Sequence, residues 1–355
     1  MKTSPEDFSY LQLLGRGGWG TTFKAREKET GKIFAIKIAN LDKIQEFDPE
    51  LYYLNEEIET LQVLSALPNA CDYISCYHSH FTTKDSPLPP DLLRLDSDLG
   101  QVSYLAFIVM DYIDTGSLAK ILDASLPPSP ELALSLLLNL ARALKFVHGA
   151  GYAHRDLHID NVMLESYSCR PKLIDFGLSC NTKKRNCNSK QGSPRTMPPE
   201  AFVEPYNFPK ARKQDIFSLG MIFYQFLNKA RPAFETEPIY YGETKYLRPI
   251  IEKFHPSTYP SKELNDIIAS MLNKTDYLRP TTSEIVSRLE NLIPFFTFCE
   301  LPDGTRVSEK KTRCAEIGGY YRDPLNPPCN FIADTADTGT RRGYSIPYSR
   351  RESYY

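Results

Sequence analysis

The sequence His154-Arg155-Asp156-Leu157-His158-Ile159-Asp160-Asn161, followed by the apolar run 162–164 and then by Leu173-Ile174-Asp175-Phe176-Gly177, decides the fold of this chain. Asp156, Asn161 and Asp175 are polar residues next to apolar segments of the length expected for buried strands. Two carboxylates and an amide oxygen that converge there suit the binding of a hard cation and the handling of a proton. Two unrelated Asp-rich turns are the alternative, and they require the same coincidence twice. These segments therefore predict one catalytic centre.

A second polar feature is the glycine-rich segment GRGGWG at residues 15–20, which lies between two expected strands. Glycine lets the backbone approach a phosphate closely, and consecutive N–H groups can hold the anion, although an ordinary hairpin turn has the same composition. A dinucleotide-binding fold needs a helix after the glycines, whereas residues 21–24 continue as a strand. Lys37 lies in the apolar segment 33–38, where a buried ammonium requires an anion unless that strand face is solvated.

Jointly these motifs resemble the eukaryotic-type protein kinases, whose known mechanics supply the roles given below. The resemblance covers about residues 8–298. Within it, the segment 192–200 resembles the part of the family that shapes a platform for a protein substrate. Asp215 resembles the buried Asp of a helix in the large lobe, and Arg279 resembles the Arg that pairs with Glu200. Glu200, Arg279 and Asp215 are therefore expected structural residues.

The resemblance and the order of the expected elements both predict an α+β protein with two lobes. A strand-rich N-terminal lobe is expected over residues 8–110, a hinge over 111–113 and a helical C-terminal lobe over 114–298. Residues 81–103, rich in Pro and Asp, predict a solvated surface loop, and residues 299–355 predict a mostly disordered tail. The expected helices span about residues 50–66, 131–149, 213–228, 262–272 and 282–293.

The resemblance implies that ATP binds between the lobes, with Mg²⁺ held by Asn161 and Asp175. It also implies that Asp156 accepts the proton of the substrate hydroxyl and orients that oxygen. Met110 is the expected gatekeeper beside the hinge. The expected ATP-binding residues are Leu14, Gly15, Arg16, Gly17, Gly18, Trp19, Gly20, Thr22, Ala35, Lys37, Met110, Asp111 and Ile113.

Lys37 is expected to hold the α- and β-phosphates and to be held in turn by a helix carboxylate. Glu56 and Glu57 are both candidates. Glu57 is preferred because Ile58 and Leu61 then take the flanking apolar positions seen in similar kinases. Lys37 and Glu57 therefore join Asp156 as expected catalytic residues.

Serine and threonine hydroxyls of proteins are the implied acceptors, because Ser193 stands where Ser/Thr-directed members carry Thr. Asp160 stands where some members contact a substrate Arg, so Ser193 and Asp160 are expected platform residues. Ser189 is an expected regulatory phosphorylation site whose phosphate pairs with Arg155, although a basic, solvated loop needs no modification. His158 departs from the family, in which a Lys usually touches the transferring phosphate.

Two other functions stay open. A pseudokinase or scaffold binds partners without transfer, and the presence of every chemistry-bearing residue disfavours it. A small-molecule kinase of the aminoglycoside or choline type shares the pattern Asp156-Leu157-His158…Asn161, but that family lacks the segment 192–200. In the tail, Ser345 and Ser353 follow pairs of Arg, and are either substrates for self-phosphorylation or incidental residues of a solvated segment.

Composition and charge narrow the class of protein. The 355 residues carry 42 Lys and Arg against 44 Asp and Glu, and this balance excludes a dedicated nucleic-acid binder. The N-terminus lacks the apolar core of a signal peptide, and the run Leu132–Val147 predicts a buried amphipathic helix instead of a transmembrane segment. We therefore expect a soluble cytoplasmic protein whose eight Cys are reduced thiols. The most closely spaced cysteines are Cys71/Cys76 and Cys180/Cys187.

Overall fold

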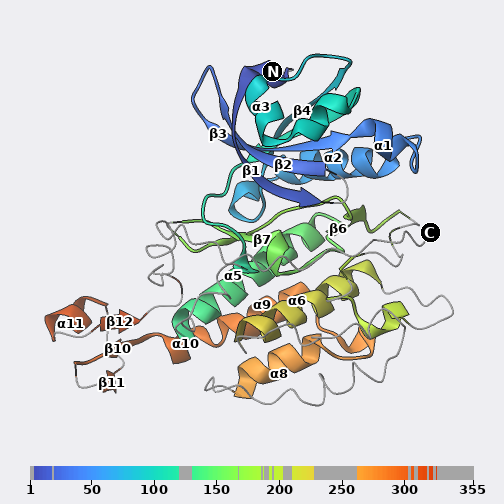
Figure 1. The fold of residues 1–355 in the computed structure, drawn as a ribbon. Helices are drawn as coiled ribbons and strands as arrows, with labels where there is room; N and C mark the ends of the chain where they lie inside the picture. The colour runs from blue at the N-terminus through green and yellow to red at the C-terminus, as the bar shows by residue number, and fades with distance from the viewer. Residues whose placement is uncertain are drawn as a thin grey trace.

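Two lobes follow one another along the chain, a strand-rich lobe and then a helical one, which confirms the α+β expectation (Figure 1). Gly18, Trp19 and Ser189, to which the sequence assigns roles, lie outside the residues that the structure describes. The structure is a computed structural model that describes residues 4–17, 20–119, 130–166, 168–184, 187, 192–193, 196–202, 210–227, 262–302, 305–307, 311–317, 320–322 and 325.

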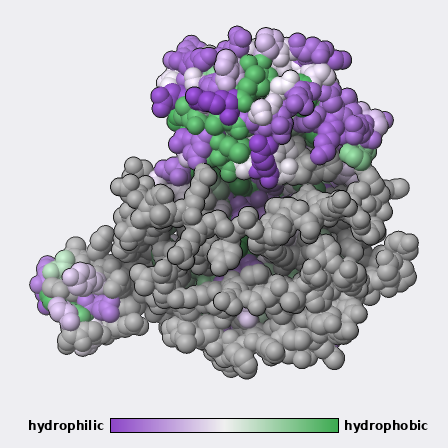
Figure 2. Space-filling model, in the orientation of Figure 1, coloured by the Kyte–Doolittle hydropathy of each residue, from purple (hydrophilic) through white to green (hydrophobic). Residues whose placement is uncertain are grey.

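The small lobe is built on one antiparallel sheet with the strand order β1-β2-β3-β5-β4. Large apolar residues at every second position of β3 bury Phe34, Ile36 and Ile38 on one face, and Lys37 therefore projects from the other face. On the side shown in Figure 2, hydrophilic residues surround a band of hydrophobic side chains on this lobe. The strands are β1 Phe8–Gly17, β2 Gly20–Glu27, β3 Ile33–Asn40, β4 Tyr77–Lys84 and β5 Tyr104–Asp111.

The helix α2 (Tyr52–Ser65) follows the short helix α1 (Leu41–Gln45) and confirms the helix expected at 50–66. Its buried positions recur at helical spacing, so one side of α2 packs inward and the other meets solvent. That spacing places the carboxylate of Glu57 on the packed side. The buried residues of α2 are Leu54, Glu57, Ile58, Thr60, Leu61 and Leu64.

The solvated loop expected over residues 81–103 is wrong. The strand β4 extends to Lys84, and the following insert forms the helix α3 (Pro90–Leu95) and a 3₁₀ turn η3 (Ser97–Gln101). A proline at the first helical position is compatible with α3 because its missing N–H has no partner there anyway. Leu92 of α3 is fully buried in the core of the small lobe, so burial of apolar side chains overrides the loop-like composition.

Two carboxylates of the insert attach it to β1. Asp91 Oδ2 accepts a hydrogen bond from the Tyr10 N–H at 2.8 Å. Asp96 Oδ2 lies 2.7 Å from Arg16 Nη1, and the Asp96 side chain is 2% exposed. The insert therefore supports the strand that leads into the glycine-rich segment.

The large lobe consists mainly of helices in the positions that the sequence predicts. Helix α5 contains a window, Leu132–Gly149, that is long and apolar enough to cross a membrane by length and composition alone. Of that window 72% is buried inside the molecule, as in the core helix of a globular domain. The helices are α5 Pro130–Gly149, α6 Ala211–Leu227, α8 Lys262–Met271, α9 Thr282–Glu290 and α10 Ile293–Phe296.

The first part of the expected tail is folded. The strands β11 (Arg306–Val307), β10 (Phe298–Glu300) and β12 (Tyr320–Arg322) form a small antiparallel sheet, with the helix α11 (Lys311–Glu316) in the same region (Figure 1). Composition predicts disorder here because Pro and Gly are frequent, and strands of two or three residues show no apolar period. Residues 326–355, with the tail serines, lie outside the described residues.

The expectation of reduced thiols is wrong. Sequence spacing points to no disulfide, because neither pair has a scaffold-like pattern. A disulfide depends instead on the approach of the two Cα atoms, which folding creates. These distances are 5.2 and 5.4 Å in the two bridges that the structure places in full. The bonded cysteines are Cys71 with Cys76 and Cys180 with Cys187, and Cys169 and Cys314 are also disulfide-bonded.

Candidate active site

Lys37, Glu57 and Asp175 meet at the junction of the two lobes. They come from β3, from α2 and from the segment after β8 (Pro171–Leu173). Lys37 Nζ lies 2.7 and 2.9 Å from the two Glu57 carboxylate oxygens and 3.2 Å from Asp175 Oδ1. The Lys37 and Glu57 side chains are 11% and 4% exposed. The structure therefore pairs the strand lysine with Glu57, the residue preferred from the sequence, and adds Asp175 to the same cluster.

The charges of this cluster set one another's pKa values. Burial lowers the pKa of Lys37, but the carboxylates of Asp175 and Glu57 outweigh burial and raise it. The Lys37 ammonium in turn lowers the pKa of Asp175. Burial raises the pKa of Glu57, and the attraction of Lys37 opposes this rise. We nevertheless take both side chains as ionised, because the Lys37 ammonium donates to both carboxylate oxygens of Glu57. One cation between two anions leaves the site with net negative charge, which favours binding of a further cation.

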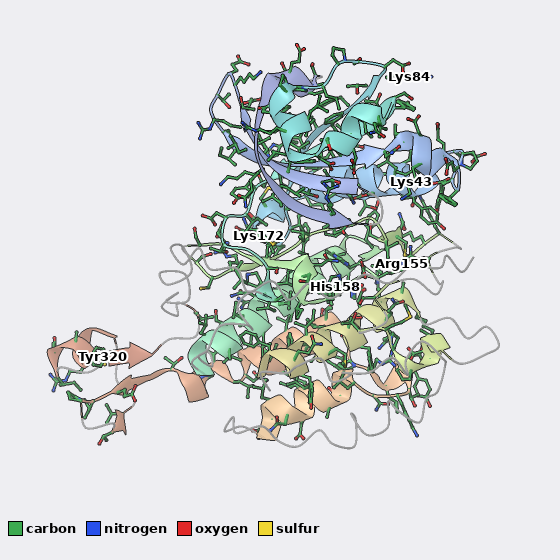
Figure 3. The ribbon with its side chains drawn as sticks, in the orientation of Figure 1. Lys43, Lys84, Arg155, His158, Lys172 and Tyr320 are labelled. Carbon is green, nitrogen blue, oxygen red and sulfur yellow. A yellow bond between two sulfur atoms is a disulfide. The ribbon has the colours of Figure 1, made fainter. Side chains whose placement is uncertain are left out.

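Asp156, His158 and Asn161 lie on the loop between β6 (Tyr152–Ala153) and β7 (Val162–Leu164). Asn161 Nδ2 donates a hydrogen bond to the Asp156 carbonyl oxygen at 2.9 Å, so the amide directs its Oδ1 elsewhere. His158 Nε2 lies 3.9 Å from Asp156 Oδ2. Figure 3 shows His158 and Arg155 at the level where the two lobes meet. Asp156 and Asn161, two of the three residues that the sequence assigns to one centre, therefore lie on the same loop.

A buried carboxylate holds this loop in place. Asp215 of α6 is 0% exposed and accepts hydrogen bonds from the backbone N–H groups of His154 at 2.8 Å and Arg155 at 2.7 Å. It also lies 2.8 Å from His148 Nε2. Arg155 and Asp175 have φ values of 65° and 59°, a left-handed conformation that costs non-glycine residues about 1–3 kcal/mol. The supporting contacts offset this cost on the two segments that carry the site.

The glycine-rich segment joins β1 to β2, and Gly17 pairs with Gly20 across the turn. A Cβ atom at Gly20 would lie 2.5 Å from the Ile38 carbonyl oxygen, so a larger residue would displace backbone. Six of the eleven expected nucleotide-binding residues that the structure describes lie on β1 and β2, while Ala35 of β3 pairs with Met110 of β5. The residues on β1 and β2 are Leu14, Gly15, Arg16, Gly17, Gly20 and Thr22.

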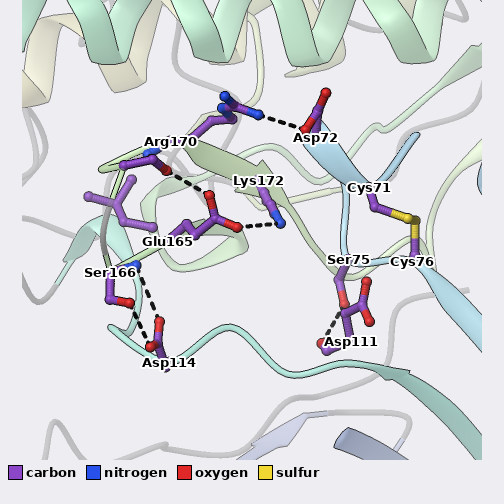
Figure 4. Close-up of polar contacts among 12 residues, drawn as sticks. Cys71, Asp72, Ser75, Cys76, Asp111, Asp114, Glu165, Ser166, Arg170 and Lys172 are labelled. Atoms are coloured by element: carbon purple, nitrogen blue, oxygen red, sulfur yellow. Dashed lines mark hydrogen bonds and ion pairs between the residues drawn. A yellow bond between two sulfur atoms is a disulfide. The ribbon is translucent and has the colours of Figure 1, made fainter. Parts of the chain in front are cut away.

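The expected hinge is attached on both sides (Figure 4). Ser75 Oγ donates to the Asp111 carbonyl oxygen at 2.8 Å, and the Ser75 N–H donates to the Leu173 carbonyl oxygen of the large lobe. His78 Nε2 lies 2.6 Å from Asp111 Oδ1. Burial raises the pKa of Asp111, but the bond to His78 outweighs burial and lowers it. Ile113 is buried, so the hinge backbone is fixed relative to both lobes.

The expected ion pair below the substrate platform is present. Both terminal nitrogens of Arg279 contact the Glu200 carboxylate, at 2.5 and 2.6 Å, and the Arg279 side chain is 0% exposed. The Ser193 carbonyl oxygen accepts a hydrogen bond from the Thr196 N–H at 3.0 Å. The Asp160 side chain is 65% exposed. Asp160 therefore lies on the loop between β6 and β7 in contact with solvent. The half-buried Ser193 follows Gly192, where a Cβ atom would clash with the Arg155 carbonyl oxygen.

Sequence reasoning missed a set of contacts beside the site. Lys184 Nζ lies 2.5 Å from Glu56 Oε1, so the rejected candidate for Lys37 has a lysine partner of its own. Arg155 donates to the carbonyl oxygen of Cys187 at 3.1 Å, where a phosphate on Ser189 was expected. The sequence signal for these contacts is the pair of cysteines, Cys180 and Cys187, on either side of Lys184. The spacing of the two cysteines does not by itself show that they are bonded.

Glu57→Gln is expected to lower kcat/KM much more than Glu56→Gln. The first change removes a carboxylate that is 4% exposed and bonded twice to Lys37, a loss of about 1.5–3 kcal/mol or roughly 10- to 100-fold. The second leaves Lys184 a further carboxylate, Glu59, at 3.4 Å. Steady-state kinetics of both purified variants test this ranking. The reverse order assigns the Lys37 partner to Glu56.

The sequence is similar to known proteins over most of its length. The sequence model of the family described as protein kinase domain matches residues 8–289. The human serine/threonine-protein kinase Nek2 is 30% identical over 300 residues, which is 81% of this chain and 60% of the relative. Arabidopsis thaliana serine/threonine-protein kinase Aurora-2 is 29% identical over 269 residues, 76% of this chain and 84% of the relative.

Other relatives are longer than the matched region. Serine/threonine-protein kinase PLK4 of Danio rerio is 25% identical over 295 residues, which is 82% of this chain. The aligned part of this chain spans 27% of that relative and 37% of the protein kinase C eye isozyme of Drosophila melanogaster. The similarity therefore concerns one region of these larger proteins.

Proposed function

The chain belongs to the protein kinase family, and we propose that it transfers the γ-phosphoryl group of ATP to serine and threonine hydroxyls of protein substrates. The observation that carries this proposal is the assembly of Lys37, Glu57 and Asp175 into one ionised cluster beside the loop of Asp156. A chain that only binds partners has no need of this cluster, in which a buried lysine is shared between two carboxylates.

The donor set fits Mg²⁺. Asp175 offers a carboxylate whose pKa is lowered by Lys37, and Asn161 offers an amide oxygen, and oxygen ligands are those that Mg²⁺ prefers. Asn161 and Asp175 would therefore hold the ion. When bound, Mg²⁺ neutralises charge on the phosphoryl oxygens.

Different residues of this chain have different roles in the transfer. The Lys37 ammonium, kept charged by Glu57 and Asp175, is placed to bind the phosphate oxygens of the nucleotide. The glycine-rich segment brings backbone N–H groups close to the same anion. Asp156 accepts the proton of the acceptor hydroxyl and orients that oxygen, so most of the acceleration comes from positioning and electrostatics.

Two observations favour serine and threonine as acceptors. Ser193 occupies the position where Ser/Thr-directed members carry Thr. Three of the similar proteins above are named serine/threonine-protein kinases. Protein substrates, a cytoplasmic location and self-phosphorylation of Ser189 or of the tail complete the proposal. The test of self-phosphorylation is phosphosite mapping of wild type beside Asp156→Ala.

The experiment that tests the function uses the purified full chain with labelled Mg-ATP and a generic basic protein, followed by phosphosite mapping. We expect phosphate on Ser and Thr of the substrate and none without Mg²⁺. Absence of transfer supports a pseudokinase, and phosphate on Tyr alone overturns the acceptor class. Turnover that amino-alcohols stimulate and proteins do not supports a small-molecule kinase.

The transfer rate is expected to fall as pH rises through the pKa of His158. Burial lowers this pKa, but the hydrogen bond to Asp160 and the charges of Asp156 and Asp175 outweigh burial and raise it above its ordinary 6.5. The imidazolium is therefore the form present at lower pH, and its positive charge beside the acceptor site is lost when the proton leaves. A loss of roughly tenfold is expected, the value of about one charge-assisted hydrogen bond.

Profiles of kcat/KM against pH, from about pH 6 to 9, check this expectation. The matched control is His158→Lys, which keeps a cation throughout this range and is expected to remove the fall. Identical profiles for the two proteins would contradict the assignment.

A further inference from the structure

The described residues 180–184 and 187, which we call the disulfide loop, lie just beyond Asp175-Phe176-Gly177, and the Cys180–Cys187 bridge joins their two ends. Both sulfurs belong to buried residues, 5% and 2% exposed. Cys180 lies on β9 (Cys180–Asn181), which pairs with β6 immediately before residues 154–161, which we call the catalytic loop. The bridge therefore fixes the far end of the loop to an element of the active site.

One side of the disulfide loop contacts the catalytic loop. Arg155 Nη1 donates to the Cys187 carbonyl oxygen at 3.1 Å, and Arg155 Nε donates to the carbonyl oxygen of Leu178, two residues before the loop, at 2.6 Å. The bridge sets where the Cys187 carbonyl lies, because it holds Cys187 against Cys180. Arg155 directly precedes Asp156, so these contacts help to set the conformation of the residue that receives the proton.

The other side of the disulfide loop contacts α2. Lys184 Nζ lies 2.5 Å from Glu56 Oε1 and 3.4 Å from Glu59 Oε2, and the bond to Glu56 raises the pKa of Lys184. Glu56 directly precedes Glu57, which holds Lys37. Lys184 is itself held inside the loop, since its N–H donates to the Asn181 carbonyl and its own carbonyl accepts from the Cys187 N–H.

The charges next to α2 favour Lys184, and not a phosphate, as the group that holds this helix. Glu56 and Glu59 present two carboxylates on the side of α2 that faces the loop, and like charges repel a phosphate. The positive charge beside α2 comes from Lys184, and the Arg155 guanidinium donates to the carbonyl oxygens of Leu178 and Cys187. The contact with α2 and the contact with Arg155 are thus both made by a loop that the Cys180–Cys187 bridge closes.

We propose that the disulfide loop is a redox-sensitive switch of this kinase, with Lys184 as a positioning residue; the proposal rests on the proposed kinase function. With the bridge closed, the loop holds α2 through the ion pairs of Lys184 with Glu56 and Glu59, and it holds the catalytic loop through Arg155. With the bridge open, Cys187 is released from Cys180, both contacts weaken and phosphoryl transfer slows.

The chemistry is thiol–disulfide exchange with a dithiol. One thiolate of the dithiol attacks a bridge sulfur, the S–S bond breaks, and the second thiol of the reagent resolves the mixed disulfide. Cys180 and Cys187 gain two electrons and two protons, and the dithiol becomes a disulfide. A disulfide oxidant reverses the step. In an intracellular protein such bridges are usually transient and redox-sensing, which agrees with a switch.

The first test compares initial transfer rates of the full chain before and after treatment with dithiothreitol, with reduction of the bridge followed by alkylation and mass spectrometry. We expect kcat to fall about tenfold on reduction, the value of about one charge-assisted hydrogen bond. Cys180→Ser/Cys187→Ser is expected to start at the low rate and to ignore the reagent. The matched control is Cys71→Ser/Cys76→Ser, which removes the Cys71–Cys76 bridge and should respond to the reagent as wild type does.

The second test exchanges the charges of the contact with α2. Lys184→Glu and Glu56→Lys are each expected to lower kcat about tenfold, and the double variant to recover most of that loss, because the opposite charges meet again. An effect of Lys184 that does not depend on its contact with Glu56 predicts no recovery. Failure of the double variant to recover overturns the assignment of Lys184.

Hydrogen exchange of the amides in α2 separates this inference from the proposed function. We expect reduction to speed exchange over residues 52–65 in wild type and not in Cys180→Ser/Cys187→Ser. If wild type transfers no phosphate, the proposed function fails and the exchange result alone decides whether the loop holds α2. Complete reduction of the bridge without any change in rate, in an active enzyme, overturns the switch.

Discussion

Asp156→Ala is expected to lower phosphoryl transfer by about 10²–10⁴-fold while leaving nucleotide binding nearly unchanged. This corresponds to about 3–5 kcal/mol of transition-state stabilisation. The reason is that the Asp156 carboxylate acts on the acceptor hydroxyl, whereas the charge cluster for the nucleotide is built from Lys37, Glu57 and Asp175. Single-turnover assays measure the loss, and titration with ATP measures binding.

The chain carries its own probe for that titration, since Trp19 of the glycine-rich segment is the only Trp in the sequence. The control for packing is Asp156→Asn, which keeps the shape of the side chain and is expected to lose as much activity. If either variant retains most of the wild-type rate, Asp156 is not the residue that receives the proton. If nucleotide binding is lost as well, the defect lies in folding of the loop.

Arg279→Ala is expected to destabilise the large lobe by about 3–5 kcal/mol, because it leaves the Glu200 carboxylate without its buried partner. Arg279 is 0% exposed, donates to both Glu200 oxygens and also donates to the Asn273 and Lys213 carbonyl oxygens at 2.8 and 3.1 Å. Its guanidinium further lies 5.0 Å from the centre of the Phe217 ring. Urea unfolding followed by circular dichroism measures the change in midpoint and slope.

The matched control is Arg142→Ala, which breaks a pair with Glu290 of similar length, 2.8 Å, between side chains that are 33% and 43% exposed. An exposed pair of this kind contributes about 0–1 kcal/mol, so the two variants should differ severalfold in their effect. Equal effects would show that burial does not decide the strength of the Arg279 pair.

The roles proposed for the site start from local sequence. Asp156, Asn161 and Asp175 are each marked by the apolar strand next to them, and Lys37 by the strand that contains it. These signals can be recognised in the sequence because the polar residue and the strand that positions it are neighbours along the chain. The two-lobed α+β fold was predictable for the same reason, since strands and helices are segregated along the chain.

The insert at 81–103 shows where local signals fail. Its Pro and Asp residues are typical of a loop, yet α3 forms because Leu92 is fully buried in the core of the small lobe. Burial of that side chain depends on the distant strand β1, whose Tyr10 N–H donates to Asp91. A pattern within the insert cannot report this partner.

The sequence by itself determined the fold class, the order of the two lobes and the residue types of the charged centre, because each follows from patterns within about ten neighbouring residues. Tertiary structure alone decided that Glu56 pairs with Lys184, which is 128 positions away, and that Cys180 bonds to Cys187. The first pairing depends on how α2 and the segment after Asp175 pack together, which no pattern along the chain reports. The second depends on the path that the segment itself takes between the two cysteines, and a spacing of seven residues does not specify that path.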